Sequence, residues 1–295
     1  MDARWDSDCG GGLRWQIFTW NSGYDYKNAI SNGCLFNLAA RLARYTGNGT
    51  KYVEVAERVW NWMDDVGFFA EEADGTMRIY DGANVPNCTD VTTWRWSYTY
   101  GVFLSGCAYM YDFTNDTKWQ TRADEILKAS MFFFNNSIMQ ESTCQPYLMC
   151  NNDQRSFRSL FSRCLGLTSI LMPETASTIR PLLEASAEGA AATCSGGGYR
   201  DACWQDWSLG PYDGYSSVLA DQVSALEVIN ALLVQEPLTI KTGSSDDTNS
   251  ETSSDVDDSV NDSNSATTGT ATAGAAKVRI LILPVSPAMA AWMIF

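Results

Sequence analysis

Amphipathic runs with helical spacing fill most of residues 28–234, and almost no strand pattern separates them. Apolar residues that recur every three or four positions predict helices with one buried face. The expected buried face of the first run consists of Ile30, Leu38, Leu42 and Tyr45, and that of the second consists of Val55, Val59, Trp62 and Met63. The seven expected helices span residues 28–45, 51–66, 95–113, 117–134, 155–172, 175–193 and 216–234. The sequence therefore predicts an all-α domain.

The C-terminal part of the sequence has a different composition. Residues 237–276 are rich in Ser, Thr and Asp and predict a disordered linker, because such a segment buries too little apolar surface to offset its ordering entropy. Residues 277–295 are mostly apolar, and together with the polar spacer they have the layout of a GPI-attachment signal. A transmembrane helix is the alternative, but Pro284 and Pro287 and the short length argue against it. Residues 1–236 form the expected folded domain.

The net charge of −15 is shared between the two parts. Residues 244–295 carry seven acidic and two basic side chains, which leaves 28 acidic and 18 basic side chains, or −10, on residues 1–243. An acidic body repels phosphate backbones, so we expect no nucleic-acid partner.

The sequence contains no histidine. This excludes Ser-His-Asp and Cys-His catalysis and most zinc chemistry. Acid–base work would fall to carboxylates, tyrosine or lysine. We expect neither a metal nor a cofactor.

Nine cysteines without Cys-x-x-Cys spacing favour disulfides in a secretory environment over a structural metal site. The expected disulfide pairs are Cys144 with Cys150, Cys194 with Cys203, and Cys9 with Cys88. Cys34, Cys107 and Cys164 lie in apolar helical stretches and are expected to be buried thiols. Sequons for N-glycosylation at Asn48, Asn87, Asn115, Asn135 and Asn261 favour the same compartment.

Several ordered motifs resemble one known family. They are Cys-Gly-Gly-Gly-Leu-Arg-Trp-Gln-Ile-Phe from Cys9, Gly-Tyr-Asp-Tyr-Lys-Asn from Gly23, the run from Asn37 to Asn48, Tyr80-Asp81-Gly82-Ala83, Asn151 to Gln154, and Gln222 to Val228. The chain resembles the fungal GPI-anchored α-1,6-mannanase-like proteins of glycoside hydrolase family 76, from about Ala3 to Leu233.

The resemblance implies an (α/α)6 barrel, of which this chain holds roughly the C-terminal seven helices. It implies an endo-acting α-1,6-mannosidase, or a transglycosidase of GPI core glycans, in the fungal cell wall. Such enzymes act with retention through two carboxylates about 5 Å apart. The implied partners are an α-1,6-mannose or GPI core glycan and, through a GPI anchor, the membrane. The implied state is a monomer, and the implied location is the secretory pathway, the outer face of the plasma membrane and the cell wall.

The family's catalytic Asn-Asp-Asp-Gln run lies upstream of the Cys-Gly-Gly-Gly motif, and this sequence has no counterpart and no signal peptide before Cys9. We therefore expect an N-terminally truncated member without the catalytic aspartate pair. Asp64 and Asp65 are not a replacement, because neighbouring helical residues point about 100° apart. Asp153 follows Asn152 in a partial copy of the motif and is expected to cap a helix.

A mixture of aromatic and polar side chains before the first helix suits a sugar, whose C–H faces pack on rings and whose hydroxyls bond to carboxylates and amides. The expected substrate-binding residues are Tyr24, Asp25, Tyr26, Lys27 and Asn28. Tyr80, Asp81, Trp204, Trp207, Tyr212 and Asp213 occupy similar loop positions. The alternative is that these aromatic residues only fasten loops to the body.

Three hypotheses remain open from the sequence. The first is a mannanase or transglycosidase whose catalytic half lies outside this chain. The second is a non-catalytic module that binds mannan or GPI glycan. The third is a non-functional fragment with exposed apolar helix faces.

Overall fold

A computed structural model describes residues 4–47, 49–194, 202–210 and 218–234. They belong to one compact unit, Met1–Thr239. The expected linker and the GPI-type signal lie outside the described residues, as do Asn48, Tyr212, Asp213 and Asn261.

The described residues form seven α-helices, as the apolar spacing predicted, and the all-α prediction is confirmed. The helices are α1 (Ala29–Thr46), α2 (Gly49–Asp65), α3 (Ser97–Thr114), α4 (Thr117–Ser130), α5 (Asn152–Leu171), α6 (Ala176–Thr193) and α7 (Leu219–Ala231). The short strands are β1 (Tyr26–Asn28), β2 (Phe69–Glu71), β3 (Met77–Ile79), β4 (Gly82–Asn84), β5 (Val91–Thr92), β6 (Phe134–Asn135) and β7 (Ile138–Met139). None of the described helices is long and apolar enough to cross a membrane.

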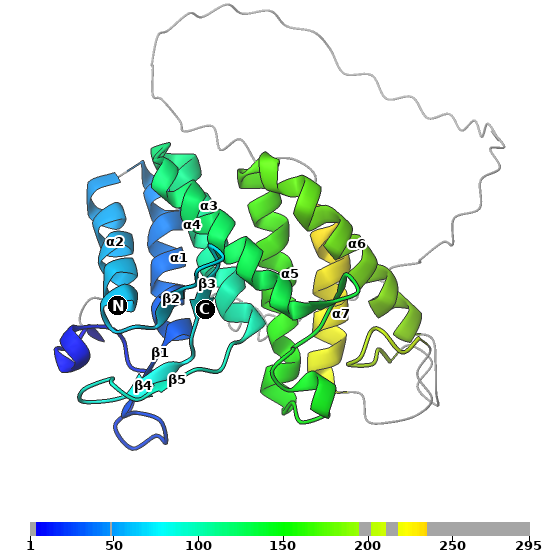
Figure 1. Cartoon of the computed structure of the whole chain (residues 1–295), viewed down its shortest axis with the longest axis horizontal. Coiled ribbons are helices and arrows are strands. Elements are labelled where there is room, and N and C mark those ends of the chain that lie inside the picture. The colour runs from blue at the N-terminus through cyan, green and yellow to red at the C-terminus, as the bar shows by residue number, and fades with distance from the viewer. Residues whose placement is uncertain (1–3, 48, 195–201, 211–217, 235–295) are drawn as a thin grey trace, which may run out of the picture. The chain divides into compact units, whose positions relative to one another are not determined.

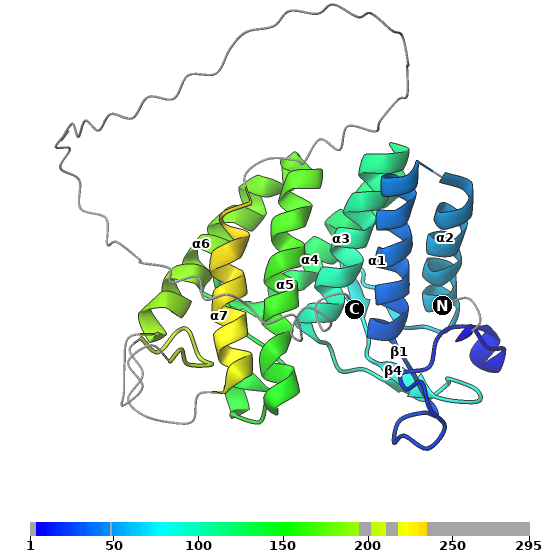
Figure 2. The ribbon, with the colours of Figure 1, turned by 180° about the vertical axis from the view of Figure 1, so that it is seen from behind.

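The helices form an inner row and an outer row (Figure 1). In the inner row α1 packs on α3, α3 on α5 and α5 on α7, and Figure 2 shows these four helices side by side. In the outer row α2 packs on α1, α4 on α3, and α6 on both α5 and α7. Alternating inner and outer helices are the arrangement expected of an α/α barrel.

The first expected helix buries a different face from the one predicted. Leu38 and Tyr45 are exposed, whereas Ala29, Gly33, Phe36, Ala40 and Ala43 are buried. The reason is close packing on α3: a Cβ on Gly33 would come within 2.7 Å of the Phe103 ring. A helix in the inner row buries its small residues, because they let neighbouring backbones approach. The second expected helix buries Val59, Trp62 and Met63 as predicted.

The inner helices all begin at one end of the helical unit. In the antiparallel sheet β1–β4–β5, β1 leads directly into α1, and the short segment after β5 leads into α3. The starts of α5 and α7 are joined by an ion pair between Arg155 and the fully buried Asp221. We call this region the N-terminal end of the inner row.

Three disulfides link the pairs that the sequence suggested: Cys9–Cys88, Cys144–Cys150 and Cys194–Cys203. Cys34, Cys107 and Cys164 are free thiols. Cys107 and Cys164 are buried as expected, but Cys34 is only partly buried. The reason is that Cys34 lies beside the buried face of α1 rather than at its centre.

Candidate functional site

Tyr26 and Asp81 lie together at the N-terminal end of the inner row. The Tyr26 hydroxyl donates a hydrogen bond of 2.8 Å to Oδ2 of Asp81. The backbone of Asp81 is fixed on both sides, because its oxygen accepts from Ala29 N (2.8 Å) and its nitrogen donates to Thr92 O (3.1 Å). The carboxyl group is therefore held where α1 begins.

Burial controls the protonation of this pair. Burial raises the pKa of the Asp81 carboxyl, while hydrogen bonds from Tyr26 and Trp96 oppose that rise. Burial also raises the pKa of Tyr26, with a further contribution from the charge of Asp81. Tyr26 therefore remains a hydrogen-bond donor at neutral pH, and Asp81 offers oxygen atoms that accept hydrogen bonds.

Aromatic rings from α3 and α5 lie beside this pair. The Tyr98 and Phe157 rings stack face to face, with centroids 3.8 Å apart and an interplanar angle of 2°. Trp96 meets Phe157 edge-to-face at 5.6 Å. Burial raises the pKa of Tyr98, and the charges of Asp81 and Asp153 add to that rise. We call Tyr26, Asp81, Trp96, Tyr98 and Phe157 the Asp81 cluster.

A buried carboxyl group binds the backbone between two residues of the cluster. Glu141 is 1% exposed, and it accepts hydrogen bonds from the backbone nitrogen of Ser97 at 3.1 Å and from the Ser97 hydroxyl. It therefore caps the start of α3, between Trp96 and Tyr98. Burial raises the pKa of Glu141 to about 7, although the bonds from Ser97 oppose this.

Of the five predicted residues before α1, two are engaged in the fold. Lys27 is fully buried, and its ammonium donates to Asp6 Oδ1 at 2.6 Å and to the backbone oxygens of Asp8 at 2.6 Å and Gly11 at 2.5 Å. Asn28 is the N-cap of α1 and accepts from Ser31 N at 3.2 Å. Neither side chain is open to a ligand, so we leave both out of the candidate site.

Of the other three residues of that group, Tyr26 belongs to the Asp81 cluster, and Tyr24 and Asp25 lie around Arg14. The Arg14 guanidinium lies 4.6 Å from the centre of the Tyr24 ring and 3.3 Å from Asp25 Oδ1. Asp25 is exposed and Tyr24 is half-buried. Both are accessible from solvent, but no described contact joins them to the Asp81 cluster.

The remaining loop residues are dispersed. Tyr80 is half-buried and directly precedes Asp81. Trp207 is buried beneath the Arg158 guanidinium, which lies 4.0 Å from its ring centre, so Trp207 fastens its loop to the body. Trp204 is half-buried in the same loop. Asp213 and Tyr212 lie outside the described residues.

The carboxylates that resembled a catalytic pair occupy helix ends. Asp64 and Asp65 are exposed at the C-terminal end of α2. The expected cap at Asp153 was wrong: Asn151 caps α5, accepting from Gln154 N at 2.9 Å while its own nitrogen donates to Gln154 Oε1. Asp153 lies in the first turn of α5 instead.

The sequon asparagines Asn87, Asn115 and Asn135 are all exposed in the described residues. Among the residues that the structure describes, no group of His, Cys, Asp and Glu side chains has the arrangement of a metal site.

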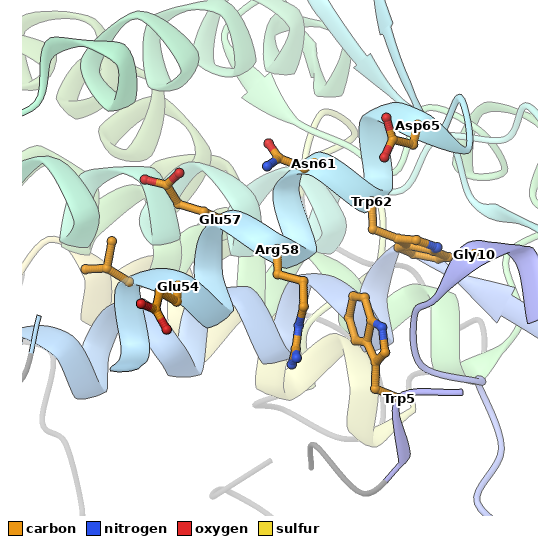
Figure 3. A pocket seen from close by; sticks show the side chains of 9 residues that line it. Trp5, Gly10, Glu54, Glu57, Arg58, Asn61, Trp62 and Asp65 are labelled. Carbon is orange, nitrogen blue, oxygen red and sulfur yellow. The ribbon is translucent and has the colours of Figure 1, made fainter. Parts of the chain in front are cut away.

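A pocket of about 680 Å³ lies on the outer face of α2 (Figure 3). Trp5 and Trp62 meet edge-to-face at its base with ring centroids 5.9 Å apart, and Arg58 lies 4.6 Å from the Trp5 ring. Glu54, Glu57, Asn61 and Asp65 project from α2 around them. The lining includes none of the residues in the Asp81 cluster.

Comparison with known proteins agrees with this arrangement. Paired inner and outer helices, with polar and aromatic side chains gathered where the inner helices begin, define an α/α barrel protein. The sequence profile described as glycosyl hydrolase family 76 matches residues 1–244. The chain belongs to this family.

The relatives are longer than this chain. It is 59% identical to a mannan endo-1,6-alpha-mannosidase, DFG5, of Candida albicans, over 100% of this chain and 66% of that protein. It resembles the crystal structure of Dfg5 from Chaetomium thermophilum in complex with glucosamine, with a TM-score of 0.76 and 36% identity over 82% of this chain and 61% of that one. This chain thus spans less than two thirds of either relative.

A bacterial enzyme shares the fold. It is an inactive variant of an alpha-1,6-mannanase of Salegentibacter, with two aspartates replaced by alanine, in complex with alpha-1,6-mannotetrose. The TM-score is 0.63 at 17% identity, over 79% of this chain and 66% of that chain.

The sequence did not single out Trp96, Tyr98, Phe157 or Glu141. Trp94-Arg-Trp-Ser-Tyr lies at a helix start. The available signal for a site was Trp96 and Tyr98 on either side of Ser97, the first residue of α3.

Proposed function

We propose that this chain forms the mannose-binding part of an endo-acting α-1,6-mannosidase or GPI-glycan transglycosidase of the fungal cell wall. The observation that carries the proposal is the Asp81 cluster, where a fixed carboxyl group and a phenol lie beside aromatic rings. The identity of 59% with a mannan endo-1,6-alpha-mannosidase over the whole chain supports the substrate class.

The cluster suits a pyranose chemically. Asp81 accepts hydrogen bonds from sugar hydroxyls, and Tyr26 orients the carboxyl group. The half-buried ring of Tyr98, which is held by stacking on Phe157, offers apolar surface to C–H faces, and the buried Trp96 supports Phe157 through an edge-to-face contact. Binding of this kind needs convergent polar groups on a rigid frame, and the two backbone hydrogen bonds of Asp81 supply that rigidity.

We further propose that a retaining pair of carboxylates acts beside this cluster and lies outside the present sequence. The chain alone would then bind α-1,6-linked mannose without turnover. We propose also that the longer protein reaches the outer face of the plasma membrane and the cell wall through a GPI signal in residues 277–295, as a monomer.

Calorimetry with α-1,6-mannotetraose tests the binding proposal directly. Asp81→Asn should weaken binding about ten- to one-hundredfold, because a hydrogen bond to a charged group is worth about 1.5–3 kcal/mol. Asp65→Asn is the matched control and should bind as the unaltered chain does. Equal affinity of both variants would refute the assignment of Asp81.

Turnover assays on this chain and on a longer form of the protein separate the first two hypotheses. The chain should release no product from α-1,6-mannan, and product formation by this chain would disprove the external acid pair. A non-catalytic binding module remains the alternative. It predicts that longer forms of the protein also fail to turn over the substrate.

A further inference from the structure

Large exposed apolar side chains gather at the N-terminal end of the inner row. Ile17, Phe18 and Trp20 lie in the loop before β1, and Tyr147, Leu148 and Met149 lie in the segment before α5. Both segments precede inner helices, and both lie at the lower edge of the helical unit in Figure 1. We call these six residues the apolar tips.

The first tip is held in a defined shape. Phe18 and Trp20 stack with ring centroids 4.7 Å apart and an interplanar angle of 12°. The loop is closed at its base by a hydrogen bond of 2.8 Å from Trp15 N to Tyr26 O. Trp20 is nevertheless 77% exposed, so the loop presents this ring to solvent instead of burying it.

The second tip is held by a disulfide. Cys144 and Cys150 close a short covalent loop, and the three apolar residues lie between these two cysteines in the sequence. Leu148 adopts a left-handed backbone with φ of 54°, which costs an L-residue about 1–2 kcal/mol. The result of this conformation is that Leu148 and Met149 are 70% and 76% exposed. Strain that directs apolar side chains outward points to a binding role rather than to folding.

The composition of the tips favours a lipid surface over a sugar. Sugars stack on ring faces, and Ile17, Leu148 and Met149 have none. Aromatic rings mixed with Leu, Ile and Met are typical of segments that enter the boundary between lipid headgroups and acyl chains.

The charge of the protein indicates which kind of lipid headgroup the apolar tips would meet. Residues 15–23 and 147–152 contain no charged side chain, and residues 1–243 carry −10 overall. Such a surface gains nothing from anionic headgroups and is repelled by them, whereas a zwitterionic surface leaves only the apolar term.

We infer that the apolar tips dock the N-terminal end of the inner row onto a zwitterionic lipid bilayer. The Asp81 cluster would then face the membrane plane, within reach of glycans that stand on lipids. This contact is independent of the proposed glycan binding.

Vesicle flotation with the full chain and phosphatidylcholine vesicles tests the inference. Replacing Ile17, Phe18 and Trp20 together by serine should lower the partition coefficient at least tenfold. The matched control replaces Leu38, Tyr45 and Leu226 by serine, which removes two aliphatic residues and one aromatic residue that are exposed on α1 and α7. It should partition as the unaltered chain does. All variants share residues 277–295, so the difference reports the tips alone.

A second variant guards against misfolding of the first. Leu148→Asn with Met149→Ser keeps a residue that tolerates a left-handed backbone, and it should also lower the partition coefficient. Unchanged flotation of both variants would overturn the inference. So would preference for phosphatidylserine vesicles, or a loss of α-1,6-mannotetraose binding with flotation intact, which would make the tips a glycan platform.

Discussion

The Tyr26 hydroxyl and Oδ2 of Asp81 lie 2.8 Å apart although 55 residues separate them in the sequence. The bond joins β1 to the residue that precedes β4, so the sheet that organises the helix starts also assembles the site. A single hydrogen bond thus connects the folding of the N-terminal segment with the protonation of the candidate binding carboxyl group.

Tyr26→Phe should raise the pKa of Asp81 further. The hydroxyl stabilises the charged carboxylate, so its removal favours the protonated form. We expect α-1,6-mannotetraose binding that depends on the carboxylate to lose affinity at a higher pH than in the unaltered chain. Calorimetric titrations across the acidic range measure this. A titration midpoint that stays in place would show that the bond does not control Asp81.

Glu141→Gln should flatten the dependence of stability on pH. The folded-state pKa of Glu141 is raised to about 7 from an ordinary value of 4.5, so the folded protein retains a proton that the unfolded chain loses. This contribution is fully present below about pH 4.5 and is lost as the pH rises through about 7. The shift corresponds to at most about 3 kcal/mol. Urea unfolding at pH 4.5 and pH 8 gives the difference for each protein, and equal pH dependence in both would contradict the assignment.

Removing the Cys9–Cys88 disulfide should cost more stability than removing Cys144–Cys150. The two bonds join residues 79 and six positions apart. Chain entropy then predicts losses of about 4.5 and about 2 kcal/mol. Double alanine variants, compared by urea unfolding, measure both. Cys34→Ala, at a free thiol, is the control. The reverse order of the two losses would rule out the entropic explanation.

Arg155→Met should destabilise the protein by about 3–5 kcal/mol, because Asp221 would remain charged and buried without its partner. Adding Asp221→Leu should recover much of the loss, since two apolar side chains fill the space of the ion pair. A double-mutant cycle by chemical unfolding measures the coupling. No recovery in the double variant would mean that Asp221 acts chiefly by capping α7, where it accepts from Val218 N at 3.1 Å.

The helices were predictable from the sequence because apolar spacing is local. The orientation of α1 was not, because Ala39, Ala40 and Ala43 contribute little to a hydrophobic pattern even though they are the residues that pack on neighbouring helices. Leu38 and Tyr45 dominate the pattern and are exposed. In a layered helical fold the smallest residues can mark the buried face.

The candidate site was predictable only in part. Tyr26 and Asp81 were expected near a ligand as separate residues, and their contact arises from strand pairing that three-residue strands scarcely reveal. Lys27 was grouped with them because it is adjacent in sequence. Charge and position alone could not show that its oxygen partners come from Asp6, Asp8 and Gly11.

Two consecutive side chains of strand β1 lie in different environments. Tyr26 reaches the carboxyl group of Asp81, and the buried Lys27 reaches into a cage of oxygen atoms from Asp6, Asp8 and Gly11. A slip of one residue in the pairing of β1 with β4 would exchange them, because side chains alternate across a strand. The ammonium would meet Asp81 and the phenol would fill the cage. A single-residue insertion or deletion between Lys27 and Ala29, where β1 leads directly into α1, would therefore damage binding and folding together, and length at this junction is as constrained as residue type.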